Sequence, residues 1–262
     1  MPYRLSFALQ KGGVGKSSST VAVASILATA GYRVLVVDFD PQGNATRMLT
    51  GNSIYHYSGH TIMEAIKAGN AEPYLIGITP RLDLIPAEDE LATFSRHIYT
   101  SKISKPYAVL KRLLEPIEDK YDFVFIDIGP SLGDTVVNAI VYADAIIIPV
   151  DLGDLAMEGM IRFIDFIEDT EKAGHTHATI AGILLTMKDN RTKNDRELSA
   201  DIRTMYGDLV FETEINRRAR IKEIASKGID LKDASMIDYI KLVEEIIQRL
   251  EKGATINERE ET

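Results

Sequence analysis

A short segment at residues 11–20, with the sequence KGGVGKSSST, combines lysine, glycine and hydroxyl residues at a spacing suited to binding phosphate. Glycines lack the Cβ atom that would keep backbone N–H groups away from a polyphosphate, and a helix beginning near Lys16 would add the positive end of its dipole. Lys16 would reach the β- and γ-phosphates, and Ser17 would offer its hydroxyl to Mg²⁺, a hard cation that takes few protein ligands. The predicted phosphate-binding residues are Lys11, Gly12, Gly13, Val14, Gly15, Lys16, Ser17 and Ser18.

The place of this segment in the chain supports the prediction. It follows an expected strand at residues 4–9 and precedes the helical pattern VAVASILATA, so strand, loop and helix come in the required order. The alternative is a glycine-rich turn without a ligand, and the G-K-S ending in this context argues against it. Gln10 stands where the template G-x-x-x-x-G-K-[S/T] has its first glycine, and Lys11 follows it. The loop is therefore a variant form.

Three aspartates follow apolar runs and could serve the same site. Asp38 and Asp40 come at the end of VLVV, and Asp127 ends FVFI. Because the carboxyl ends of parallel strands open into the ligand crevice, these side chains would face phosphate and metal. Asp127 occupies the Walker B position, where a carboxylate holds Mg²⁺ directly or through its waters. The alternatives are a solvated strand-end carboxylate at Asp127 and an Asx turn before Pro41 at Asp40.

Several segments together resemble one known family. KGGVGKSS resembles the deviant Walker A box of the ParA/MinD class of P-loop ATPases. VVDFDPQGNAT at residues 36–46 resembles the switch I strand and loop of the ParA branch, and FIDIGPSLG at residues 125–133 resembles its Walker B and switch II. The segments ADAIIIPVDLGDLAMEGM, GILLTMKDNRTKND and INRRARIKEIASKGI resemble later blocks in the same order, so the similarity spans about residues 4–250. Gly129 replaces a residue that is usually Thr or Pro, and Asn216 replaces the Pro of the usual I-P-R.

The resemblance implies ATP and Mg²⁺ as cofactors and gives the charged residues roles. Lys11 would cross an ATP-sandwiched homodimer to the partner's phosphates, which agrees with the small gain expected from a second ammonium beside Lys16 in the same subunit. Asp40 would orient the attacking water and could also reach the metal through water, and Asp127 would bind the metal shell. Asp38 would either support the loop or act on the water. The predicted catalytic residues are Lys11, Lys16 and Asp40, and the predicted metal residues are Ser17 and Asp127.

Two further groups of residues are candidate contact surfaces. The segment between residues 217 and 227 contains five cationic residues and one glutamate, and it has no aromatic residues for base stacking. It would grip DNA phosphates without reading sequence, as its resemblance to the ParA DNA-binding block implies, or it is simply a solvated face. The predicted DNA-binding residues are Arg217, Arg218, Arg220, Lys222 and Lys227. Thr186 and Met187 end an expected strand and would line the purine or pack in the core.

Short β-rich runs alternate with longer helical patterns along the chain. The runs VLVV, FVFI and AIIIPV are almost continuously apolar, as in central parallel strands that are covered on both faces. We therefore predict an α/β fold with a doubly wound, mostly parallel sheet flanked by helices, as a single domain over residues 1–250. A helix from about residue 237 would dock on the core, and residues 251–262 would form a polar, disordered tail. The expected strands are residues 4–9, 33–38, 82–86, 122–127, 145–150 and 179–185.

Composition excludes several other classes of protein. The 262 residues include no cysteine, which removes disulfides, thiolate zinc sites and the iron–sulfur chemistry of the nitrogenase-iron-protein branch. No segment is long and apolar enough for a membrane span, so the expected location is the cytoplasm, in association with the nucleoid. The formal net charge is -9, so a polyanion must be met by a local basic patch.

Together with these features, the resemblance to the ParA branch implies an ATPase that dimerises with ATP, binds non-specific DNA and is released by slow hydrolysis. It also implies a centromere-binding ParB-type protein or a cargo adaptor that stimulates hydrolysis, with plasmid or chromosomal DNA as the cargo. One alternative positions a protein cargo on the nucleoid. A MinD-like membrane-cycling ATPase is disfavoured, because residues 251–262 hold four glutamates against one lysine and one arginine. A metabolic P-loop enzyme would leave the basic block without a role.

Overall fold

The chain forms an eight-stranded sheet in the order β3-β4-β2-β5-β1-β6-β7-β8. A computed structural model describes the backbone of residues 1–153, 156–188, 193–216 and 236–260. Every strand pair in the sheet is parallel except the pair between β3 and β4. This confirms the predicted doubly wound α/β fold. The strands are β1 Tyr3–Phe7, β2 Val34–Phe39, β3 Ile76–Thr79, β4 Leu82–Ile85, β5 Phe123–Ile128, β6 Ala145–Asp151, β7 Thr179–Lys188 and β8 Ile215–Asn216.

The six predicted strands are all present, and each end lies within three residues of its predicted position. The sequence did not predict β3 or β8. β3 is a four-residue edge strand with half-exposed isoleucines, and β8 has two residues, so neither offers enough positions for an apolar pattern to stand out.

Helices cover both faces of the sheet, and the sheet separates the apolar core into two layers. Alternate residues of each central strand face opposite ways, so Val34 and Val36 join one apolar cluster while Leu35 and Val37 join the other. Helices α1, α2 and α10 cover the first face, and α3–α8 cover the second. The helices are α1 Lys16–Thr29, α2 Asn44–Thr50, α3 Ile62–Ala68, α4 Phe94–Thr100, α5 Val109–Glu118, α6 Asp134–Tyr142, α7 Ala156–Lys172, α8 Lys193–Tyr206 and α10 Ile237–Glu260.

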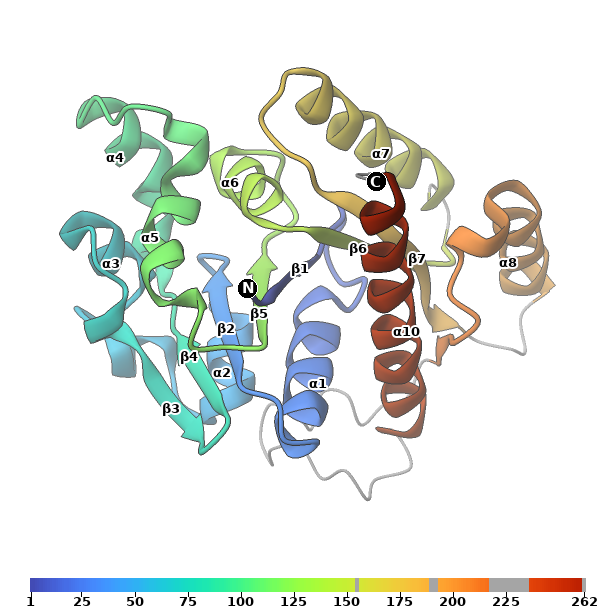
Figure 1. Cartoon of the computed structure of the whole chain (residues 1–262), viewed down its shortest axis with the longest axis horizontal. Helices are drawn as coiled ribbons and strands as arrows, with labels where there is room; N and C mark the ends of the chain where they lie inside the picture. Colours follow the sequence, from blue (N-terminus) through green and yellow to red (C-terminus); the bar gives the residue numbers. More distant parts are fainter. Residues whose placement is uncertain (154–155, 189–192, 217–235, 261–262) are drawn as a thin grey trace.

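Helix α1 packs against β1, β2 and β5 and has α10 beside it, as Figure 1 shows, while α10 itself reaches β7 and β8. The apolar residues of α1 from Val21 to Leu27 are buried almost all round, as expected for a helix that the sheet and neighbouring helices cover. Leu242, Val243 and Ile246 of α10 complete this layer, which confirms the predicted docking of the last helix. The helix that begins at the phosphate loop is therefore held rigidly.

The last helix is longer than its apolar pattern predicted. The backbone of residues 251–260 continues α10, and the predicted disorder of residues 251–262 stays a prediction. The segment EKGATINERE contains no proline, and Gly253 is its only strong helix-disfavouring residue. Glu251, Lys252 and Gly253 are exposed, so a polar sequence here is compatible with a helix that extends beyond the core.

Candidate phosphate and metal site

The phosphate loop joins β1 to α1 and has the backbone that its glycines predict. Gly13 and Gly15 adopt positive φ angles of 77° and 86°, a left-handed conformation in which a side chain would be strained. Gly15 caps α1 without a side-chain hydrogen bond, and its carbonyl accepts from Ser19 N at 2.8 Å. The N–H groups of the first helical turn have no intrahelical acceptor and are free to bind an anion.

Lys16 points into this loop and is buried, with 7% of its surface exposed. Its Nζ donates a hydrogen bond to the carbonyl oxygen of Lys11 at 2.7 Å. Burial lowers the pKa of Lys16, and the carboxylates of Asp127 and Asp40 oppose this effect. A buried ammonium with one neutral acceptor is well suited to a polyanionic ligand, which would supply the missing charge.

Asp127 is a buried carboxylate whose charge has little compensation from hydrogen bonds. It is fully buried in β5, and among the described residues no group meets hydrogen-bond geometry with either of its carboxylate oxygens. Burial and the charge of Asp38 raise its pKa well above the usual range, and the nearby Ser17 hydroxyl and Lys16 partly offset this. An unpartnered carboxylate beside a hydroxyl is a hard oxygen donor set, which fits Mg²⁺.

Asp38 has a supporting role. It is fully buried opposite Asp127 in the β2–β5 register. Its Oδ2 accepts hydrogen bonds from the Thr46 N–H at 2.8 Å and the Thr46 hydroxyl at 2.7 Å, and the hydroxyl also accepts from Ala87 N at 3.0 Å. Burial raises the pKa of Asp38 to about 6, and the Thr46 hydrogen bonds oppose the rise. Of its two predicted roles, support of the loop is the one that these contacts favour.

Asp40 forms the Asx turn that was weighed for it, and its role in orienting the water stays a prediction. Its Oδ1 accepts from Gln42 N at 3.0 Å, which is the hydrogen bond of an Asx turn. The same carboxylate lies beside Gly129, at the end of β5, and only 6% of Asp40 is exposed. The turn therefore points the carboxylate toward the end of β5.

The two loop lysines point to different partners. The Nζ of Lys11 lies 3.9 Å from Asp151 Oδ2 at the end of β6, in a partly exposed position. Lys11 thus has an acidic neighbour within its own subunit, and its predicted role across a dimer stays a prediction.

Thr186 contacts the phosphate loop itself. It is fully buried, and its hydroxyl donates to Val14 O at 2.9 Å. The predicted purine contacts of Thr186 and Met187 stay predictions, because the side chain of Met187 lies outside the described residues. The basic block is also outside them: Arg217, Arg218, Arg220, Lys222 and Lys227.

Sequence reasoning missed Thr46 and Asp151 as members of the site. Thr46 lies inside the quoted segment VVDFDPQGNAT, and Asp151 directly follows the apolar run AIIIPV. A strand-end carboxylate next to a ligand crevice is a signal that could have found Asp151. Nothing local indicates that Thr46 turns back to Asp38, since this contact depends on how α2 meets β2.

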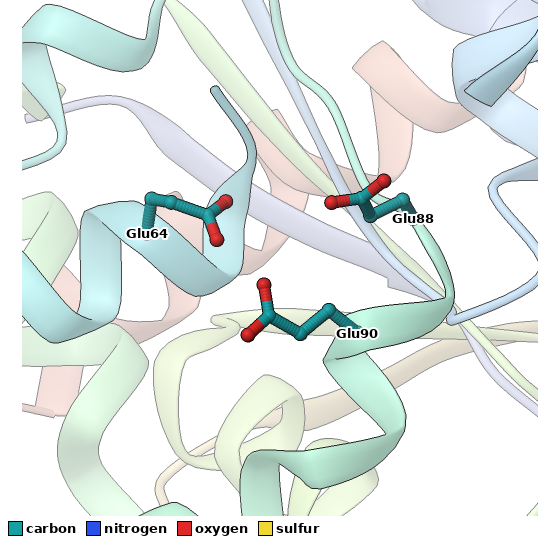
Figure 2. Close-up of side chains that lie close together, drawn as sticks. All are labelled: Glu64, Glu88 and Glu90. Atoms are coloured by element: carbon teal, nitrogen blue, oxygen red, sulfur yellow. The ribbon is translucent and has the colours of Figure 1, made fainter. Parts of the chain in front are cut away.

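A second group of carboxylates, Glu64, Glu88 and Glu90, lies close together, as Figure 2 shows. Each has a partner in the protein. Glu64 completes a capping box with Thr61 at the start of α3, Glu88 accepts from Ser58 Oγ at 2.5 Å, and Glu90 pairs with Lys67. These contacts tie α3 to the segment after β4, which accounts for the cluster structurally.

Comparison with known proteins gives consistent matches. A family model described as an AAA domain matches residues 4–180. The chain is 35% identical over 253 residues to the chromosome-partitioning ATPase Soj of Treponema pallidum, covering 94% of this chain and 97% of that protein. It is 34% identical over 255 residues to the chromosome partitioning protein ParA of Caulobacter vibrioides, covering 94% of each.

Solved structures show the same likeness. Cobyrinic acid a,c-diamide synthase from Mycobacterium smegmatis, solved with an ATP analogue and magnesium, superposes with a TM-score of 0.84 at 26% identity, covering 97% of each chain. Among the described residues, no helix has the length and apolar character needed to cross a membrane.

Proposed function

The chain belongs to the ParA family of partition ATPases, and on that premise we propose that ATP and Mg²⁺ drive it into a homodimer that binds DNA without sequence preference. Hydrolysis, stimulated by a ParB-type protein or a cargo adaptor, then releases the DNA. The cycle would segregate a plasmid or a chromosome from a cytoplasmic, nucleoid-associated pool.

One observation supports the nucleotide part of this proposal above the others. The buried carboxylate of Asp127 has no hydrogen-bond partner among the described residues, and it lies near Lys16 and Ser17 at the start of α1. When bound, Mg²⁺ would neutralise charge on the β- and γ-phosphates. Ser17 and Asp127 would hold it, and a solved structure at 26% identity contains an ATP analogue with magnesium.

Phosphate binding, orientation of the water and the contact across the dimer are assigned to three side chains of the protein. Lys16 would exchange its hydrogen bond to Lys11 O for the phosphates. Asp40 would orient the attacking water by accepting its hydrogen bond, since its carboxylate lies at the end of β5. Lys11 would leave Asp151 and reach the phosphates of the partner subunit, as a cation delivered in trans.

The DNA part of the proposal depends on the sequence. The basic block at residues 217–227 is the densest group of cations in a chain of net charge -9, and DNA phosphates are the ligand that matches it. The names of the relatives refer to chromosome partitioning, which favours DNA segregation over a small-molecule reaction such as that of cobyrinic acid a,c-diamide synthase.

Sedimentation velocity with ATP and Mg²⁺ tests the proposal. Lys11→Ala should bind ATP yet stay monomeric, and Asp40→Ala should accumulate as an ATP-bound dimer because it retains only a slow residual rate of hydrolysis. Lys16→Ala should lose nucleotide binding altogether. Lys172→Ala is the matched control, since Lys172 is an exposed lysine of α7, and it should behave as wild type.

Two outcomes would contradict these assignments. If Lys11→Ala forms a normal ATP-dependent dimer, Lys11 does not act on the phosphates of the partner subunit. If Asp40→Ala hydrolyses ATP at the wild-type rate, Asp40 does not orient the attacking water.

A further inference from the structure

Gly129 lies directly against the carboxylate of Asp40. A Cβ atom built on Gly129 would come within 3.1 Å of Asp40 Oδ1, 3.2 Å of Cγ and 3.5 Å of Oδ2. The first two distances are shorter than ordinary van der Waals contact, and the three nearest heavy atoms all belong to Asp40. The carboxylate therefore occupies space that a side chain at position 129 would take.

The loop that carries Asp40 has little freedom to move away. Asp40 Oδ1 accepts from Gln42 N at 3.0 Å, and Asp40 O accepts from Gly43 N at 2.9 Å. Asp38 and Thr46 tie the base of the loop to the sheet through the buried hydrogen bonds described above. A displacement of the Asp40 carboxylate would therefore stretch its own turn.

The backbone of Gly129 has no need of glycine. Gly129 is absent from the glycines with positive φ, so another residue could adopt its conformation without strain. What glycine supplies at this position is the absence of a Cβ atom, which leaves room for the Asp40 carboxylate.

We propose that Gly129 is a positioning residue that sets where the Asp40 carboxylate lies and thereby sets the rate of ATP hydrolysis. The proposal depends on the function proposed above, in which Asp40 orients the attacking water. Misplacing a catalytic group by about 1 Å can cost about 100-fold in rate, so a shift of a few tenths of an ångström is enough to be measured.

The test compares Gly129→Ala with Gly133→Ala. Gly133 belongs to the same segment between β5 and α6, has an extended φ of -147°, and has no atom within 4 Å of its built Cβ. Single-turnover hydrolysis should fall about 3- to 10-fold in Gly129→Ala and stay at the wild-type rate in Gly133→Ala. ATP affinity and ATP-driven dimerisation should be unchanged in both variants, because only the water-orienting step is affected.

A double-mutant cycle shows whether the effect passes through Asp40. In the Asp40→Ala background, adding Gly129→Ala should leave the residual hydrolysis rate unchanged, since the group it displaces is gone. The proposal is overturned if Gly129→Ala hydrolyses ATP like wild type, if Gly133→Ala slows equally, or if Gly129→Ala slows the Asp40→Ala variant further. Failure of the wild-type chain to hydrolyse ATP would instead overturn the proposed function.

Discussion

Asp38, Asp40 and Asp127 lie at the ends of β2 and β5, and each has a different environment. Asp38 accepts hydrogen bonds from Thr46, Asp40 accepts from Gln42 beside Gly129, and Asp127 has no such partner among the described residues. Hydrogen bonding to a carboxylate stabilises its charged form, whereas burial alone destabilises it. Burial of Asp127 without a hydrogen-bond partner therefore lowers the free energy of unfolding, and a bound metal would offset this loss.

Asp127→Asn is predicted to stabilise the nucleotide-free protein. The change removes a buried charge next to Asp38, so the free energy of unfolding at pH 7 should rise by about 1–3 kcal/mol. With ATP and Mg²⁺ the order should reverse, because only the wild type gains binding energy. Urea unfolding with and without ATP-Mg²⁺ measures both effects.

The pH dependence follows from the raised pKa of Asp127. In the folded state this carboxyl holds its proton to higher pH than its ordinary value of 3.8, so its destabilising effect is absent below that value and grows as the pH rises. The gain in unfolding free energy that Asp127→Asn gives over wild type should therefore appear above about pH 4 and be absent below it. A constant difference across pH 3–7 would contradict this account.

At the scale of elements, α10 fastens the segment that leads to the basic block. Glu245 accepts hydrogen bonds from Glu212 N at 2.9 Å and Thr213 N at 3.1 Å. The Arg249 guanidinium lies 4.1 Å from the centre of the Phe211 ring and donates to the carbonyls of Ala181, Leu209 and Val210. These contacts hold residues 209–213 against β7, just before the chain enters the predicted DNA-binding residues.

Gly182→Ala is predicted to loosen this junction. Its Cβ would come within 2.5 Å of Phe211 and 2.7 Å of Arg249 Nη1, so the variant should lose about 1–3 kcal/mol of unfolding free energy. Gly159→Ala in α7 has no atom within 4 Å of its built Cβ and should gain up to about 1 kcal/mol. Urea denaturation compares them, and equal stabilities would show that the contact at Gly182 is not tight.

The sequence predicts those elements whose signals are local. The phosphate loop and the six main strands are read from continuous runs, because glycine spacing and apolar stretches act over a few residues. The contacts of Thr46 and Asp151 depend on residues far along the chain, so no local pattern contains them. The end of α10 at Glu260 lies beyond the apolar pattern of this helix, because the polar residues 251–260 offer no apolar face from which its length could be predicted.

At the scale of the whole molecule, the proposed function requires an acidic protein to bind a polyanion through one basic block. If two or three cations per subunit reach phosphates, a dimer neutralises about four to six, and log K should fall with log salt at a slope of roughly -4 to -5. Replacing Arg218 and Arg220 with Glu should abolish DNA binding on every sequence and leave dimerisation intact. The control makes the same charge change at two exposed residues of α7, Arg162→Glu with Lys172→Glu, and should retain binding apart from a modest long-range effect.

The central claim is that ATP, by forming the dimer, creates the DNA-binding state. Fluorescence anisotropy of random-sequence DNA at about 100 mM salt, with the Asp40→Ala chain and either ATP or ADP, tests it most directly. We predict tight binding with ATP and Mg²⁺, little binding with ADP, and no binding to anionic vesicles in a parallel flotation assay. Equal DNA binding with ATP and ADP, or ATP-dependent binding to vesicles without binding to DNA, would contradict the account.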